Sequence, residues 1–81
     1  MRRVFTQSPR KHRIAKGRAE YVIARTQADS ERVGQDMILS WLGRDQRGIE
    51  LEIVGKITND FRTGERILLI MHVMPTALRR N

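Results

Sequence analysis

The stretch ILLIMHVMP, at positions 67–75, contains the longest uninterrupted apolar run of the sequence and one histidine, His72. Consecutive branched and long apolar side chains are typical of a β-strand that is covered on both faces. Proline has no backbone N–H to donate to a sheet, so Pro75 is expected to end this strand and turn the chain. The sequence therefore predicts a strand over residues 66–74 with His72 near its end.

Two more β-rich runs precede this strand, MILSWLG at 37–43 and IELEIVGKIT at 49–58. The segments between the runs, RDQRG and NDFRTGE, are short and rich in turn residues. Short connections favour an antiparallel meander of three strands. Val4-Phe5-Thr6 could add a short edge strand at the N-terminus.

Helical signals lie in the first third of the chain. Ser8 and Pro9 form an N-cap and first-turn pair, which predicts a short helix over 9–13. A second helix is expected from residue 15 or 16 to about 27, because one apolar stripe recurs at helical spacing: Ala19, Val22, Ile23 and Thr26. The polar segment ADSERVGQD, at 28–36, is expected to be a loop.

Together these elements predict an α+β fold. Two short N-terminal helices would pack on one face of a small, three-stranded antiparallel sheet. With 81 residues the chain has room for one small core. We expect one domain over 1–81, with a basic helical part at 1–27, the meander at 37–74 and a basic tail at 75–81.

The composition excludes several kinds of site. The chain has no cysteine, so it can form neither a disulfide nor a thiolate metal site, and two histidines alone make a poor zinc site. We therefore expect no metal and no cofactor. The longest apolar run is too short to span a bilayer, and the N-terminus lacks the apolar core of a signal peptide. The expectation is a cytoplasmic protein without membrane contact.

The net charge of +7 is concentrated at the N-terminus. Residues 1–25 contain eight basic side chains and one acidic side chain, whereas the rest of the chain contains eight of each. The eight are Arg2, Arg3, Arg10, Lys11, Arg13, Lys16, Arg18 and Arg25. Such a segment is typical of a surface that binds phosphate groups or an acidic partner. The competing interpretation is a solvated basic face.

Alternation along the strands predicts one core face and one polar face. In the middle run Glu50 and Glu52 point away from the apolar side. If the odd positions of the last run face the helices, His72 and Arg66 join these carboxylates on the uncovered face. That face would also carry an apolar patch of Leu68, Ile70 and Met74. We therefore expect a surface that is half binding site and half interface.

Such a face has the parts for metal-free cleavage of RNA. A base activates the 2′-hydroxyl, an acid protonates the leaving 5′-oxygen, and guanidinium groups stabilise the phosphoryl charge. Histidine suits the acid or base role because its ordinary pKa is near neutrality. The candidates are His72, Glu50 or Glu52, Arg66, Arg79 and Arg80. The competing interpretation makes His72 a half-buried structural histidine and the glutamates a solvated strand face.

His12 lies in the basic cluster RKHR at the end of the first expected helix. It could cap helix carbonyls in its protonated form, or it could be a phosphate ligand. Trp41 shares its register with Met37 and Leu39, so we expect it in the core or an interface.

The order of these elements resembles the small BrnT-like toxins of bacterial type II toxin–antitoxin systems. The resemblance is carried by SPRKHRIAKGRAEYVI at 8–23, by WLGRDQRGIELEIV at 41–54 and by LLIMHVMP at 68–75. These toxins belong with the RelE/ParE-like toxins, which are mostly metal-free ribonucleases. This chain is shorter than many relatives, with reduced N-terminal strands, which would favour dimerisation or antitoxin pairing at a sheet edge.

The resemblance implies an RNA endonuclease that stops translation and is neutralised by a small antitoxin, typically a ribbon–helix–helix protein. It carries over Lys11 and His12 and the closing His72, while Arg79 and Arg80 correspond loosely to basic residues after the last strand. The resulting hypothesis has His72 as acid or base, Glu52 as its partner and Arg66 and Arg79 on the phosphate. The expected RNA-binding residues are Arg10, Lys11, His12, Arg13, Arg18 and Arg80.

Two other classes of function remain open at this point. The first is a non-catalytic nucleic-acid-binding or regulatory module that uses the basic N-terminal region. The second is an interaction protein whose basic segment docks on an acidic chain. Phosphate binding would weaken steeply as salt rises, which distinguishes the nucleic-acid hypotheses from the last one.

Overall fold

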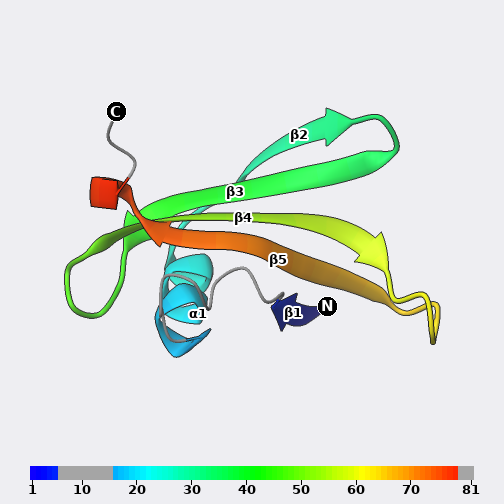
Figure 1. The fold of residues 1–81 in the computed structure, drawn as a ribbon, viewed down its shortest axis with the longest axis horizontal. Helices are drawn as coiled ribbons and strands as arrows, with labels where there is room; N and C mark the ends of the chain where they lie inside the picture. The colour runs from blue at the N-terminus through cyan, green and yellow to red at the C-terminus, as the bar shows by residue number, and fades with distance from the viewer. Residues whose placement is uncertain (6–15, 79–81) are drawn as a thin grey trace.

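The computed structural model describes residues 1–5 and 16–78 of the chain (Figure 1). The described elements form one five-stranded sheet, with one α-helix and one short 3-10 helix beside it. They are β1 (Arg2–Phe5), α1 (Lys16–Arg25), β2 (Asp29–Val33), β3 (Asp36–Arg44), β4 (Glu50–Asn59), β5 (Arg66–Pro75) and η2 (Thr76–Leu78).

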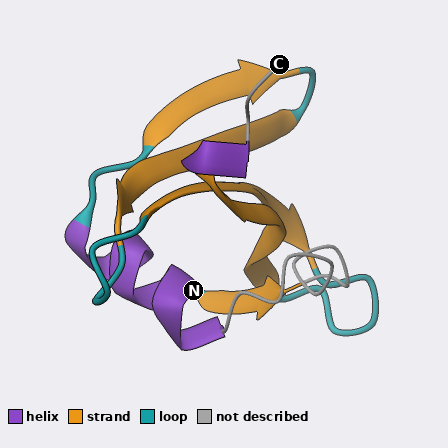
Figure 2. Cartoon of the chain, turned by 60° about the vertical axis from the view of Figure 1, so that its left-hand side comes forward, coloured by secondary structure: helices purple, strands orange, loops and turns teal. Residues whose placement is uncertain are grey.

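The strand order in the sheet is β1-β5-β4-β3-β2. Strands β2 to β5 form an antiparallel meander, while β1 pairs in parallel with β5. The first and last strands of the chain are therefore neighbours in the sheet, although they are more than sixty residues apart in sequence: Arg2 pairs with Ile67. Figure 2 shows the strands curling around the side on which α1 lies.

The predicted fold class is wrong. The sheet has five strands and is mixed, and the described residues contain a single α-helix, so the molecule is mostly β. The helix expected at 9–13 falls outside the described residues. The helix expected from 15 or 16 is confirmed as α1, and the three runs of the meander are confirmed as β3, β4 and β5.

The segment expected to be a loop instead contains β2. All five of its residues are exposed, so the apolar alternation that reveals a strand is missing. Backbone pairing to β3 makes it a strand, and Gly34 supplies the positive φ of 64° at the turn between them. The short N-terminal strand is confirmed at the sheet edge, but it begins at Arg2 and is parallel to its neighbour.

The core lies between α1 and the facing side of the sheet. The helix contributes three side chains on one stripe, and β3 contributes Trp41, which is 5% exposed. The buried cluster consists of Ala19, Val22, Ile23, Trp41, Leu51, Ile53, Leu68, Ile70 and Val73. The helical stripe predicted from sequence is therefore the one that packs on the sheet.

A β-bulge in β5 decides which side chains reach this core. Val54 pairs with His72 and Gly55 pairs with Ile70, which leaves Met71 as an extra residue without a partner. Positions before the bulge and after it therefore alternate in opposite phase: Ile70 and Val73 both lie in the core. The apolar patch expected on the uncovered face is wrong, because Leu68 and Ile70 are core residues.

Within the described part of the chain, no helix has both the length and the apolar character needed to cross a membrane.

Candidate functional site

The face of the sheet opposite α1, which we call the open face, carries the candidate residues. Its members alternate with buried neighbours: Leu51 and Ile53 of β4 are fully buried, and the residues between them point the other way. The open face of the central strands includes Ser40, Leu42, Glu50, Glu52, Val54, Lys56, Thr58, Ile67, Leu69, His72 and Met74.

His72 and Glu52 form a pair at the centre of the open face. His72 Nε2 lies 4.0 Å from Glu52 Oε1, and the two side chains are 35% and 23% exposed. In the β4–β5 register His72 is opposite Val54 and Glu52 is opposite Met74, so the pair is diagonal across neighbouring strands. An imidazole and a carboxylate are thus held together on rigid strands where a ligand can reach both.

Glu50 is tied to the segment that follows Pro75. Thr76 donates a hydrogen bond from Oγ1 to Glu50 Oε1 over 2.8 Å, and this contact holds η2 against β4. The chain therefore turns at the end of β5 and returns to the strand that carries Glu52. The prediction that Pro75 ends the strand is confirmed. Thr76 was missed at the sequence level, because nothing in its neighbours signals a contact with a glutamate 26 residues away.

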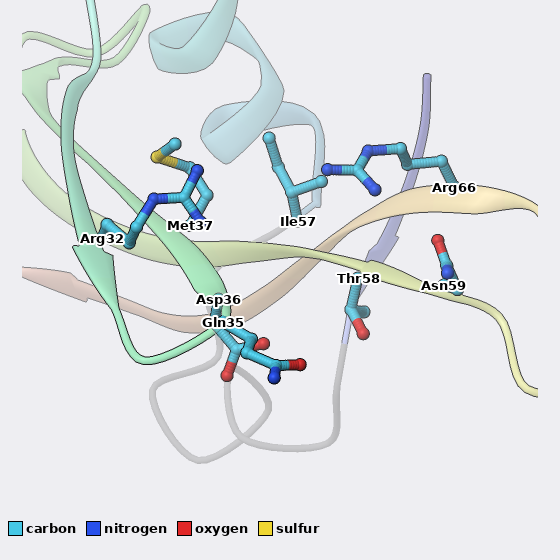
Figure 3. Close-up of a pocket in the computed structure, with 8 residues that line it drawn as sticks. All are labelled: Arg32, Gln35, Asp36, Met37, Ile57, Thr58, Asn59 and Arg66. Carbon is cyan, nitrogen blue, oxygen red and sulfur yellow. The ribbon is translucent and has the colours of Figure 1, made fainter.

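Arg66 does not join His72. Because of the bulge, Arg66 lies on the α1 side of the sheet, and it lines a cavity of about 230 Å³ there together with Met37 and Ile57. Figure 3 shows all three side chains directed toward the helix side. The expectation that Arg66 and His72 share a face is wrong for a geometric reason: one extra residue between them inverts the alternation.

Arg18, one of the expected RNA-binding residues, is used within the fold. Its Nε donates to Asp45 Oδ2 over 2.6 Å, and the Asp45 side chain is fully buried. The other carboxylate oxygen accepts hydrogen bonds from the backbone N–H groups of Arg47 and Ile49. The contact fastens α1 to the turn between β3 and β4.

Asp45 keeps its charge in this buried place. Burial alone would raise the pKa of Asp45, but the hydrogen bonds from Ile49 N–H, from the Arg18 guanidinium and from Arg47 N–H outweigh it and hold that pKa below the usual 3.8. The sequence signal was present, because an aspartate at the start of a tight turn commonly accepts backbone N–H groups two residues on. Asp45 is thus a structural residue.

The other expected RNA ligands lie outside the described residues. Arg10, Lys11, His12, Arg13, Arg79 and Arg80 are among these. Five of the sixteen basic residues of the chain are in this group, while all nine acidic residues are described. The described part therefore carries eleven basic and nine acidic side chains, and most of the positive excess belongs to residues 6–15 and 79–81.

Over residues 1–5 and 16–78, no three side chains of histidine, aspartate or glutamate gather as a metal site. Comparison with protein-family models, curated proteins and solved structures finds no match to the chain.

Proposed function

We propose that this chain is a metal-independent endoribonuclease, acting as the toxin of a bacterial type II toxin–antitoxin system. The observation that carries the proposal is the His72–Glu52 pair, with 4.0 Å between Nε2 and Oε1 on an accessible sheet face. The resemblance of the sequence to BrnT-like toxins supports the same assignment, since it includes the His-x-Met-Pro segment that contains His72.

In the proposed reaction the Glu52 carboxylate accepts the proton of an RNA 2′-hydroxyl. The 2′-oxygen attacks phosphorus, the bond from phosphorus to the 5′-oxygen breaks, and protonated His72 gives its proton to that oxygen. The products are a 2′,3′-cyclic phosphate and a 5′-hydroxyl. Arg79, which follows η2 in the chain, is proposed to stabilise the charge on the phosphoryl oxygens.

The proposed regulator is an antitoxin of the ribbon–helix–helix class that binds the toxin and blocks this face. The two edges of the sheet, β1 and β2, are a second proposed place for pairing, either with the antitoxin or with another copy of the chain. Size-exclusion chromatography across a range of protein concentrations tests the second case. A monomer at every concentration would remove self-pairing at the edges from the proposal.

A non-catalytic nucleic-acid-binding module is the second candidate. The observation that favours it is the position of the charge in the sequence: most of the positive excess belongs to residues 6–15 and 79–81, whereas Glu50 and Glu52 of the open face are acidic. Under this alternative the chain binds RNA or DNA through its basic segments and leaves it intact. His72 would then be a structural histidine.

The test is RNA cleavage by purified protein in the presence of EDTA, compared among wild type, His72→Ala and Glu52→Gln. We expect cleavage by wild type with cyclic-phosphate ends, and a loss of about 100-fold or more in rate for each variant, because general acid–base groups contribute about 10² to 10⁴. Arg47→Ala is the matched control, since the Arg47 side chain is exposed and its hydrogen bond to Asp45 comes from the backbone N–H, which the substitution keeps.

Thermal unfolding of each variant guards against loss of the fold. His72 and Glu52 are partly exposed, so their ion pair contributes at most about 1 kcal/mol and the variants should fold. Intact RNA after incubation with folded wild type, together with salt-sensitive RNA binding, would support the second candidate instead. Growth arrest on expression in bacteria, relieved by His72→Ala, tests the toxin assignment separately.

A further inference from the structure

A hollow on the open face extends over β1, β5 and β4 and reaches the β4–β5 turn. Its volume is about 430 Å³, within the range of small-molecule sites. The floor is apolar and comes from two adjacent strands: Val4 of β1 pairs with Leu69 of β5, and Ile67 lies beside them. The rim consists of Arg2, Lys56, Thr58, Asn59, Asp60, Phe61 and Arg62. We call this hollow the β1–β4 pocket.

Phe61 stands on the rim of the β1–β4 pocket and is 94% exposed. Because the fold does not bury the Phe61 ring, its apolar faces are accessible to a ligand. Phe61 is one of only two phenylalanines, and the other, Phe5, packs against the core. An exposed ring beside an apolar floor is suited to stacking on a flat aromatic ligand.

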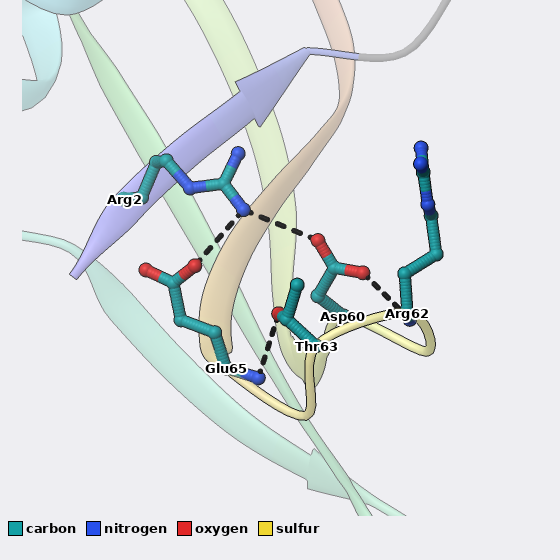
Figure 4. A network of polar contacts seen from close by, with 5 residues as sticks. All are labelled: Arg2, Asp60, Arg62, Thr63 and Glu65. Atoms are coloured by element: carbon teal, nitrogen blue, oxygen red, sulfur yellow. Dashed lines mark hydrogen bonds and ion pairs between the residues drawn. The ribbon is translucent and has the colours of Figure 1, made fainter.

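The turn that presents Phe61 is held in place. Arg2 Nη2 donates to Asp60 Oδ2 over 3.2 Å and to Glu65 Oε1 over 3.0 Å, and Asp60 Oδ1 accepts from Arg62 N–H (Figure 4). Arg2 is therefore occupied by two carboxylates. In Figure 4 the Arg62 side chain is directed away from this network. The rim thus offers the cations of Lys56 and Arg62 next to the ring.

The β1–β4 pocket and the His72–Glu52 pair are joined by one strand. Glu52, Val54, Lys56 and Thr58 follow one another on the open face of β4. The six steps along the strand from Glu52 to Thr58 span roughly 20 Å, at about 3.4 Å a step. That is a length suited to about four nucleotides, the lower end of the site size of grooves that follow a single strand.

We propose that the β1–β4 pocket is a nucleotide subsite for single-stranded RNA, with a base stacked on Phe61 and its phosphates against Lys56 and Arg62. The choice of RNA rests on the proposed function. The composition of the rim favours it over an acidic peptide, because an exposed aromatic ring together with two cations can contact both the base and the phosphates of a nucleotide. An RNA strand bound here runs along β4 toward His72.

The test measures affinity without cleavage. The probe is a fluorescein-labelled RNA of about ten nucleotides and mixed sequence, bound to the His72→Ala protein and followed by anisotropy. Adding Phe61→Ala should weaken binding by about 10-fold or more, since stacking on one base is worth that much. Phe61→Trp should restore it, and Val33→Ala, which removes an exposed side chain from β2, should change nothing.

A second pair of variants tests the phosphate contacts. Lys56→Gln with Arg62→Gln should weaken binding and reduce its dependence on salt by about two phosphate contacts. Equal RNA affinity of the Phe61→Ala and parent proteins would overturn the subsite. So would a Phe61→Ala substitution that weakens binding of an acidic peptide but not of RNA. Wild type that fails to cleave RNA but binds it through Phe61 would overturn the ribonuclease and leave the subsite standing.

Discussion

Gly55 shows how closely single residues control this sheet. It sits opposite the bulge, paired with Ile70, and its missing side chain faces the core. A Cβ built there would lie 2.9 Å from the backbone oxygen of Leu69 and 3.1 Å from Ile70 Cδ1. The space beside the bulge therefore admits only glycine unless the backbone moves. The close packing of β5 against this position requires that β4 has a glycine here.

Gly55→Ala is expected to destabilise the protein by roughly 1–3 kcal/mol, because a methyl group in a full core moves backbone and side chains. Gly17→Ala is the matched control: no atom of the described residues lies within 4 Å of a Cβ at this position, and Gly17 is in a helix. That variant should be as stable as wild type or more stable by up to about 1 kcal/mol. Urea unfolding of the two proteins measures both, and an unchanged Gly55→Ala midpoint would contradict the packing argument.

At the scale of elements, the bulge in β5 determines which side chains of this strand enter the core and which lie on the open face. Before Met71, the even positions Leu68 and Ile70 are in the core, and after it Val73 is. His72 reaches the open face beside Glu52 because the extra residue between Ile70 and His72 is accommodated as a bulge. A regular strand would have placed either His72 or Ile70 on the wrong side of the sheet.

Deletion of Met71 is expected to preserve cooperative folding, because it removes only the extra residue of the bulge and leaves Ile70 and Val73 in phase on the core side of β5. Met71→Ala keeps the count of residues and should remain folded, with a loss of about 1–2 kcal/mol for a partly buried side chain. Circular dichroism during heating measures the melting of both variants. A deletion variant without a cooperative transition would contradict this account of Met71 as an insertion that the core does not require.

At the scale of the whole molecule, ion pairs join parts of the chain that are distant in sequence. Asp45 receives Arg18 from α1, and Asp60 receives Arg2 from β1. The pKa of Asp60 is lowered, first by the hydrogen bond from Arg62 N–H, with burial opposing and Arg2 adding to it. Both carboxyl groups therefore favour the folded state in their charged form.

This arrangement predicts loss of stability in acid. A carboxyl whose pKa is lower in the folded protein than in the unfolded chain stabilises the fold above the unfolded pKa, and that contribution disappears as pH falls through the folded pKa. The free energy of unfolding should therefore decline as pH falls below about 4, the ordinary value for aspartate. Urea unfolding at pH 7 and at acid pH measures the decline.

Asp45→Asn is the control for this assignment. The variant should be less stable than wild type at pH 7, because the amide cannot accept from both Arg18 and the turn as a carboxylate does. It should also lose less stability in acid. An equal acid loss in both proteins would place the titrating groups elsewhere.

The sequence alone was sufficient for the elements with a strong periodic pattern. The stripe of Ala19, Val22 and Ile23 located α1, and the apolar runs located β3, β4 and β5, since spacing of buried side chains is a local property. The His72–Glu52 pair was also within reach, because it needs only neighbouring strands in register. Its role in catalysis stays a prediction.

The tertiary structure decided the rest. β2 is a strand because β3 offers it backbone partners, β1 pairs in parallel with the edge of β5, and Arg66 is separated from His72 by a bulge. These features depend on hydrogen bonds between residues far apart in the chain and on one unpaired position. The local spacing of apolar side chains indicates neither these long-range hydrogen bonds nor the unpaired position. Only the assembled sheet therefore determines which residues share the open face.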